Sequence, residues 1–312
     1  MNDLDTDLAR VDTDELRGSL DGMRDVVRHL AEEHAAVWTA PFPDFAEALT
    51  ALGRVDLCLA RLVEGHADAL RILQQAGEEA HPGVYAVWAS RSAGTGVAAL
   101  PSRPGWQLDG ELRFASGIDV VDRALLPGWV DSDTHLLFDL PVAGVEADRS
   151  TWRTSAMDAA RSFTVGVHQR CDSSSVVGQA NFYLDRPGFL VGGLGVAAVW
   201  AGGAQSLLDQ VTAGLRRFVP TAHQLRRLGL VEQFVWTART AVEVTARRLP
   251  DLDAAGVARE TTLARTAVVA ACEQAGIETE RIVGPGGLSG EARLARTLAD
   301  LALFVRQHHV DG

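Results

Sequence analysis

The stretch that decides the expected fold is Leu108-Asp109-Gly110-Glu111-Leu112-Arg113-Phe114-Ala115-Ser116-Gly117. It reads as a strand, a tight turn at the Asp-Gly pair, a second strand, and then a small polar residue beside a glycine. An Asp-Gly pair is typical of type I′ hairpin turns, because both central residues of such a turn take positive φ. The stretch lies at the centre of a β-type region, from about 84 to 177, between two long helical stretches. Few classes of enzyme place a small β domain in the middle of a helical chain, so this order restricts the function more than any single residue does.

The whole chain is therefore expected to be an α+β protein in three parts. Residues 1–81 predict a short helical N-terminal domain, which begins with an amphipathic helix over 12–36. Residues 82–177 predict a small antiparallel β-barrel or sandwich as the middle domain. Residues 178–312 predict a four-helix bundle, with helices near 193–217, 221–248, 253–275 and 289–308, because long helices with short links favour antiparallel packing.

Composition excludes several classes of function. The 312-residue chain has a formal net charge of -12, which argues against a nucleic-acid partner, since phosphate binding needs clustered basic side chains. All of its basic residues are Arg, so mechanisms that need a Lys are excluded. The three cysteines are far apart and odd in number, which suits a reducing cytosol. The first residues are acidic and lack an apolar core, so a cytoplasmic location is expected rather than secretion.

The apolar stretch from Gly188 to Ala204 has no charged residue. It is short for a membrane span and rich in glycine, so it predicts a core helix that another helix approaches closely, and no membrane partner. Within it, Gly193-Leu-Gly195-Val-Ala-Ala198 matches the G-x-G-x-x-A pattern of dinucleotide-binding turns. Helices rather than a second parallel strand follow, so a packing role is favoured for these glycines.

Two motifs near the end of the chain leave alternatives open. Gly284-Pro285-Gly286-Gly287 can present backbone N–H groups to a phosphate, or it can be a plain turn between helices. His308 can act as a base in a pocket, or it can be a helix-end histidine favoured by the helix dipole. It is followed by His309, and adjacent side chains on a helix point about 100° apart, so no metal site is expected there.

The order of helical domain, β domain and four-helix bundle resembles the acyl-CoA dehydrogenase family. Residues 108–117 look like the family's L-x-G-x-K-x-(W/F)-I-T-(N/S) run, and residues 157–165 look like its G-M-R-x-(S/T)-x-(S/T)-x-x-V run. The helix around Gln224 resembles the bundle helix that carries a flavin-contacting glutamine. Residues 286–300 resemble the family's G-G…R-x-x-R-D end through Gly286, Gly287, Arg293, Arg296 and Asp300. The resemblance covers roughly residues 50–312, and its specific part is the order of the motifs.

The resemblance implies an FAD cofactor, a small-molecule acyl substrate and a homo-oligomer, since the family completes its flavin site across a subunit interface. The flavin-contacting residues that it implies are Phe114, Ser116, Thr164, Arg217, Gln224, Gly286 and Gly287.

The chain also departs from the family pattern. The family's T-E-P-x-A-G-S-D run corresponds to residues 88–95, which contain no Thr-Glu-Pro, and its R-x-x-F-G run is reduced to residues 216–220. The family's common catalytic Glu falls near residues 307–309, where no carboxylate occurs. Some family members carry this Glu on a bundle helix instead, which makes Glu232 and Glu243 candidates.

The expected function is that of an FAD-dependent oxidoreductase acting on CH–CH bonds of an acyl thioester or a related substrate. In this chemistry a base removes the proton α to the thioester, and neutral His308, with an ordinary pKa of about 6.5, is the candidate base. One alternative is a flavin-dependent monooxygenase of the same fold, in which the protein chiefly excludes water and orients the substrate. Another is a flavin-free, non-catalytic relative, which the eroded motifs favour.

Overall fold

The computed structural model describes residues 3–307 and has the expected α+β architecture, with helices before and after a single sheet. The N-terminal helices are α1 (Asp3–Leu8), α2 (Thr13–Gly18), α3 (Leu20–Glu33), α4 (Ala35–Trp38), α5 (Phe42–Val55) and α6 (Leu57–Ala76). The strands are β1 (Tyr85–Val87), β2 (Gly96–Pro101), β3 (Trp106–Ala115), β4 (Arg123–Trp129), β5 (His135–Pro141), β6 (Glu146–Asp148), β7 (Phe163–Cys171) and β8 (Val176–Val177). The C-terminal helices are α7 (Phe182–Asp185), α8 (Gly188–Leu215), α9 (Ala222–Arg248), α10 (Ala254–Gly290) and α11 (Ala292–Phe304).

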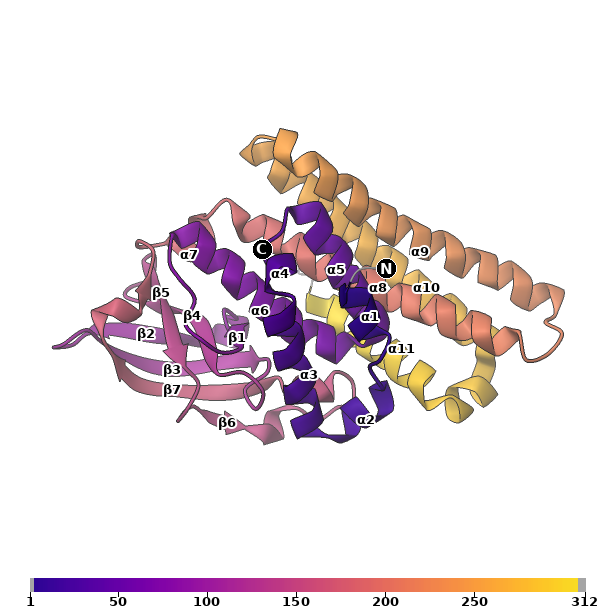
Figure 1. The fold of residues 1–312 in the computed structure, drawn as a ribbon, viewed down its shortest axis with the longest axis horizontal. Helices are drawn as coiled ribbons and strands as arrows, with labels where there is room; N and C mark the ends of the chain where they lie inside the picture. The colour runs from indigo at the N-terminus through magenta and orange to yellow at the C-terminus, as the bar shows by residue number, and fades with distance from the viewer. Residues whose placement is uncertain (1–2, 308–312) are drawn as a thin grey trace.

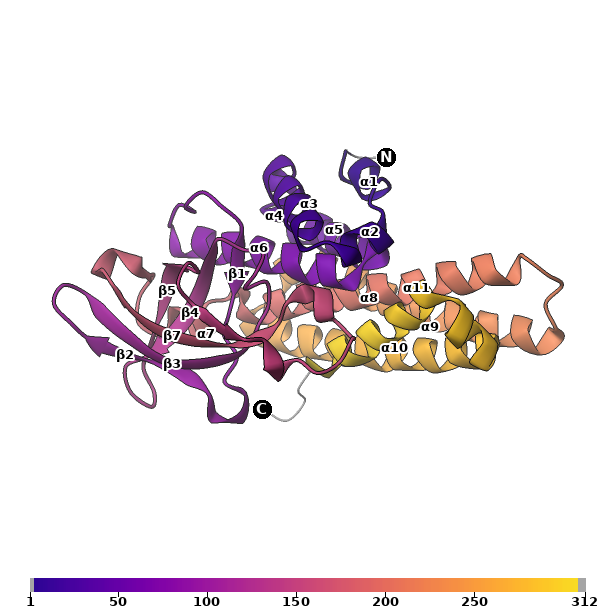
Figure 2. The ribbon, with the colours of Figure 1, turned by 90° about the horizontal axis from the view of Figure 1, so that it is seen from below.

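The sheet and the long helices occupy opposite ends of the molecule. The strands lie at the left of Figure 1, while α8, α9 and α10 extend to the right as an elongated bundle. Figure 2 shows α1 to α5 along one side of the molecule, with α6 between them and the sheet. Helix α6 packs on β1, and α5 packs on α8, so the N-terminal helices contact both ends.

The sheet has eight strands in the order β6-β7-β3-β2-β4-β5-β8, with β1 paired to β4. Most neighbours are antiparallel, as expected, but β4 runs parallel to both β1 and β2, so the sheet is mixed. Strand β3 lies between β2 and β7 and is the longest strand.

The prediction of a hairpin turn at Asp109-Gly110 is wrong, because both residues lie inside the continuous strand β3. Gly110 has φ 150° and pairs with Val97 on one side and Val167 on the other. A Cβ at this position would lie 2.2 Å from the Gly96 carbonyl oxygen, so the glycine permits close strand approach rather than a turn. The β2–β3 turn lies upstream, where the Ser102 N–H donates to the Gly105 carbonyl.

The helix expected over residues 12–36 is divided into α2 and α3. Asp12 caps α2 through bonds from the Asp14 and Glu15 N–H groups, and Ser19 caps α3 through a 3.0 Å bond from the Gly22 N–H. Each cap accepts hydrogen bonds from N–H groups that have no partner within the helix. Because Ser19 provides a second cap, a new helix begins there and the predicted single helix is divided in two.

Helix α8 contains the G-x-G-x-x-A motif, which therefore forms no strand-to-helix turn. As expected, glycines bring it close to a neighbouring helix. A Cβ at Gly202 would lie 2.1 Å from the Thr50 carbonyl oxygen on α5, and one at Gly53 would lie 2.2 Å from the Val199 carbonyl oxygen on α8. Among the described residues, α8 is the one helix that is long and apolar enough to cross a membrane, but most of its apolar segment is buried inside the fold.

One buried arginine joins the three parts of the chain. Arg17 on α2 donates to Asp56 before α6 at 2.6 Å and to Asp300 on α11 at 2.5 Å. Asp300 also accepts the Met157 N–H at 2.6 Å, in the segment that leads to β7. The R-x-x-R-D run that resembled a cofactor-binding end therefore supplies, through Asp300, a structural contact.

The close approach of α5 and α8 gives a direct test. Gly202→Ala is expected to lower the free energy of unfolding by about 1–3 kcal/mol, because the new methyl group overlaps the α5 backbone. Gly214→Ala lies on the same helix with nothing within 4 Å of the added Cβ, and it is expected to raise stability by about 1 kcal/mol through helix propensity. Urea unfolding measures both, and equal effects would contradict the packing account.

Candidate functional site

The end of β3 holds an exposed aromatic ring in an unusual backbone conformation. Phe114 has φ 60°, which is uncommon for a residue with a side chain, and its side chain is 46% exposed. The pairing of β3 with β7 shifts register between Leu112 and Ala115, and this irregularity turns Phe114 outward. Its ring meets the edge of Trp152 at 6.4 Å, and the Arg113 guanidinium lies 5.2 Å from its centroid.

Ser116, two residues further on, faces the interior instead. It is 7% exposed, and its Oγ lies 2.8 Å from Ser162 Oγ and accepts a bond from Arg61 Nε at 3.2 Å. The Trp88 indole N–H donates to the Ser116 carbonyl at 2.9 Å. The two residues predicted to face one flavin therefore lie on different sides of the end of β3, one exposed and one hydrogen-bonded to α6.

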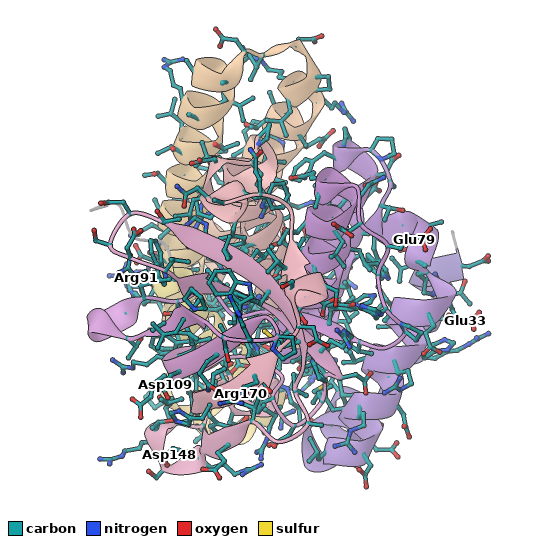
Figure 3. The ribbon with its side chains drawn as sticks, turned by 90° about the vertical axis from the view of Figure 1, so that its left-hand side faces the viewer. Glu33, Glu79, Arg91, Asp109, Asp148 and Arg170 are labelled. Atoms are coloured by element: carbon teal, nitrogen blue, oxygen red, sulfur yellow. The ribbon has the colours of Figure 1, made fainter. Side chains whose placement is uncertain are left out.

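A groove of about 660 Å³ lies over β3, β6 and β7. Phe114 and Trp152 do not line it, but their chain neighbours Arg113, Thr151 and Arg153 do. Thr164 lies in its floor, and its backbone N–H donates to Thr151 Oγ1 at 3.0 Å. The polar groups that line the groove are the hydroxyls of Thr95, Thr151 and Thr164, the guanidiniums of Arg113 and Arg153, the imidazole of His168, and the carboxylates of Glu111, Glu146 and Asp148. Figure 3 faces this end of the molecule and labels Asp109, Asp148 and Arg170, which come from β3, β6 and β7.

The bundle residues predicted to contact flavin lie at the end of the molecule that is farther from the sheet. Arg217 pairs with Glu291 at 2.5 Å, and Gln224 caps α9 and donates to the Ile282 carbonyl at 3.3 Å. Gly286 and Gly287 lie in the last turns of α10. These four residues are brought together where α8 meets α9 and α10 meets α11, at the right of Figure 1, far from the sheet.

The Gly284-Pro285 pair kinks α10. Gly284 takes φ 59° and ψ -170°, which interrupts the helix before Pro285 starts its last turns. The segment therefore joins two helical pieces.

The candidate bases differ in their surroundings. His308 lies outside the described residues. Glu232 and Glu243 are both exposed on α9, and Glu243 pairs with Arg247 at 2.7 Å. Neither exposed carboxylate lines a cavity described above.

A buried polar stripe on α6 was missed by the sequence reasoning. Arg61, Glu64, Asp68 and Arg71 recur at helical spacing on a helix that is otherwise largely apolar. That spacing of charges within an apolar helix was the available signal, because isolated charges are rarely buried without partners. Arg61 joins the stripe to Ser116 and pairs with Glu64.

Burial raises the pKa of Glu64 to about 7, and the neighbouring Arg61 guanidinium only partly opposes this rise. Burial also raises the pKa of Asp68, against the opposing charges of Arg186 and Arg61. A carboxyl whose pKa lies near neutrality can take or release a proton under physiological conditions.

No family model matches the sequence, and a search of curated proteins finds no match. Solved structures do match it along nearly the whole chain. TdsC from a Paenibacillus species, with FMN and indole, has a TM-score of 0.82 and 15% identity, covering 99% of this chain and 93% of that one. PigA with FAD and proline has a TM-score of 0.77 and 12% identity, with 97% and 93% coverage. The methanesulfinate monooxygenase MsuC from Pseudomonas fluorescens has a TM-score of 0.77 and 15% identity, with 98% and 92% coverage.

The identities are low, so these matches establish the fold. The chain has the acyl-CoA dehydrogenase-like fold that these three proteins share.

The raised pKa of Glu64 predicts a dependence of stability on pH. Between about pH 4.5 and pH 7 the folded chain holds a proton that the unfolded chain releases, so this residue contributes less stability as the pH rises. The Gln side chain of Glu64→Gln does not titrate, so the variant lacks this loss of stability. Its free energy of unfolding minus that of the parent is expected to rise by up to about 3 kcal/mol from pH 4.5 to pH 8.

Urea unfolding at both pH values measures this difference. Glu79→Gln, at an exposed position labelled in Figure 3, serves as the control and should show almost none of it. A relative loss of stability for Glu64→Gln at high pH would mean that pairing with Arg61 outweighs burial.

Proposed function

We propose that this chain is a flavin-dependent oxidoreductase that binds FAD beside Phe114. The observation that carries the proposal is this exposed ring, held at φ 60° at the end of β3 and next to a groove of about 660 Å³. Exposed aromatic rings can serve as stacking surfaces for ligands, and backbone strain clusters at binding sites. Among the similar structures, PigA contains FAD and TdsC contains FMN, which supports a flavin as that ligand.

The groups around Phe114 fit a flavin nucleotide. Phe114 and Trp152 offer aromatic surface to the ring system, while Arg113, Arg153 and the threonine hydroxyls offer donors to phosphate oxygens. The carboxylates of Glu146 and Asp148 disfavour phosphate near β6, so we expect the phosphates beside the two arginines. A bound flavin supplies two-electron redox chemistry, and the chain holds its ring, excludes water and orients the substrate.

A second copy of the chain is proposed to complete the site. Arg217, Gln224, Gly286 and Gly287 come from the junctions α8–α9 and α10–α11, while Phe114 comes from the end of β3. These junctions lie at the right of Figure 1, away from the sheet. The bundle also exposes large apolar side chains, which a homo-oligomer would cover. Examples on α9 and α10 are Leu225, Trp236 and Leu263.

For the reaction, we favour a monooxygenase, because Glu232 and Glu243 are exposed and no carboxylate occurs at residues 307–309. Substrate oxygenation needs no carboxylate base. One observation favours the alternative, an acyl-thioester dehydrogenase: the buried Glu64 has a pKa raised to about 7, as a base for a weakly acidic C–H bond requires. Oxygen consumption in the presence of reduced flavin would support the monooxygenase. Bleaching of the bound flavin by an acyl-CoA in the absence of oxygen would support the dehydrogenase.

Flavin binding tests the proposed site. The parent is expected to bind FAD, and Phe114→Ala to raise the Kd about tenfold through loss of ring contact. Leu100→Ala removes a comparably exposed apolar side chain from β2, away from the groove, and should leave the Kd unchanged. Titration followed by visible absorbance and thermal shift measures all three. A colourless parent with no shift would contradict the proposal and favour a flavin-free relative.

Co-expression tests whether two copies share the site. Phe114→Ala and Arg217→Ala each remove one side of it, so each alone should bind FAD weakly. A mixed oligomer contains some sites that carry neither substitution, and FAD binding should recover in part. No recovery in a mixture shown to contain both variants would exclude a shared site.

A further inference from the structure

A second cavity, of about 260 Å³, lies between α5, α6 and the start of α8. It is separate from the groove on the sheet. Its apolar wall is formed by Phe42, Phe45, Val191, Leu249 and Val257. Its polar side is formed by Glu64, Asp68, Arg71, Gln75 and Arg186. The cavity is thus apolar on one side and charged on the other.

Arg186 is the most informative of these residues. It is 5% exposed, and its Nε has no hydrogen-bond partner. Its guanidinium donates to Gln75 Oε1 at 3.2 Å, and the nearest oxygen of Asp68 lies 3.8 Å away, beyond a normal hydrogen bond. A buried guanidinium with an unused donor costs free energy, so Arg186 can gain a hydrogen bond from an acceptor that enters the cavity.

The charges around the cavity point to an anion. The guanidiniums of Arg71 and Arg186 line the cavity together with the carboxylates of Glu64 and Asp68. Two further guanidiniums, of Arg61 and Arg265, do not line it but interact with Glu64. Arg71 bonds to the carbonyls of Trp38 and Ala40, which carry no charge.

Arg265 has an Nε without a partner, and burial lowers the pKa of both Arg71 and Arg265. Burying positive charge in excess of negative charge is unfavourable unless a counter-charge enters.

The start of α8 adds to this preference. Gly188 and Gly192 line the cavity, and a Cβ at Gly192 would lie 3.1 Å from Asp68 Oδ1 and 3.8 Å from an Arg186 nitrogen. The N-terminal end of this 28-residue helix carries partial positive charge and N–H groups without helical partners. A negative group beside Arg186 would therefore face positive charge from two directions.

We propose that this cavity binds a small organic carboxylate with an aromatic or branched apolar body. The carboxylate accepts hydrogen bonds from Arg186, and the body lies against Phe42 and Phe45 and the side chains of Val191 and Val257. The apolar wall favours such a molecule over inorganic phosphate, which would leave that wall in contact with water. This inference does not rest on flavin binding.

The test uses 3-phenylpropionate on the full chain without added flavin, with 3-phenylpropanamide as its neutral counterpart. The acid is expected to raise the thermal midpoint and to give a measurable Kd by calorimetry, and the amide to bind at least tenfold more weakly. Equal binding of acid and amide, or equal binding of inorganic phosphate, would overturn the proposal.

Two variants locate the site. Arg186→Met is expected to abolish the preference for the acid over the amide. Arg186→Met also removes a buried ion pair with Asp68. If the Arg186→Met protein does not fold, a second variant still tests the proposal. Val257→Trp fills part of the cavity without removing a charge and should weaken binding of 3-phenylpropionate at least tenfold.

Val244→Trp, at an exposed position on α9, is the matched control and should bind as the parent does. Unchanged binding in Val257→Trp would place the ligand elsewhere and refute the inference. FAD titration of the same variants separates this outcome from any failure of the flavin site.

Discussion

The arrangement of the three parts depends on the buried contact of Arg17 with Asp56 and Asp300. Breaking one side of a buried ion pair leaves an uncompensated charge, at a typical cost of about 3–5 kcal/mol. Asp56 has a further task, since its Oδ1 accepts the Cys58 and Leu59 N–H groups at the start of α6. Asp300 in turn holds the Met157 N–H. One guanidinium thus fixes the start of α6, the last long helix and the segment before β7 relative to each other.

Helix α6 is the element through which this arrangement reaches the end of β3 and the second cavity. One of its faces packs on the sheet, where the Tyr85 N–H donates to His66 at 3.1 Å. Its polar stripe runs from Arg61, which contacts Ser116 at the end of β3, to Asp68 and Arg71, which line the second cavity. Because the stripe is buried, its charges are set by their neighbours rather than by solvent. The end of β3 and the second cavity are therefore both held in position by the same helix, α6.

The sequence predicted the order of elements well and the details of the site poorly. Apolar periodicity and helix signals placed the long helices near their observed positions, because those signals are local. The turn at Asp109-Gly110 was predicted wrongly, because turn propensity is a local property and does not include the neighbouring strands of the sheet. Strand β3 stays continuous through these two residues because it pairs with β2 along one edge and with β7 along the other. Phe114 was found through a resemblance, but its outward direction depends on a register shift that no local pattern encodes.

By itself the sequence determined the fold class and the glycine-rich packing of α8, because both depend on periodicity, composition or motif order. Phe114 as a flavin contact stays a prediction from the family resemblance. Only the tertiary structure decided that Ser116 faces inward and that the bundle glycines lie at the far end from the sheet. It alone brought Glu64, Asp68 and Arg186 to one cavity. The physical reason is that burial and pairing of charges depend on residues distant in the chain, such as Arg186 and Asp68, which lie on different helices.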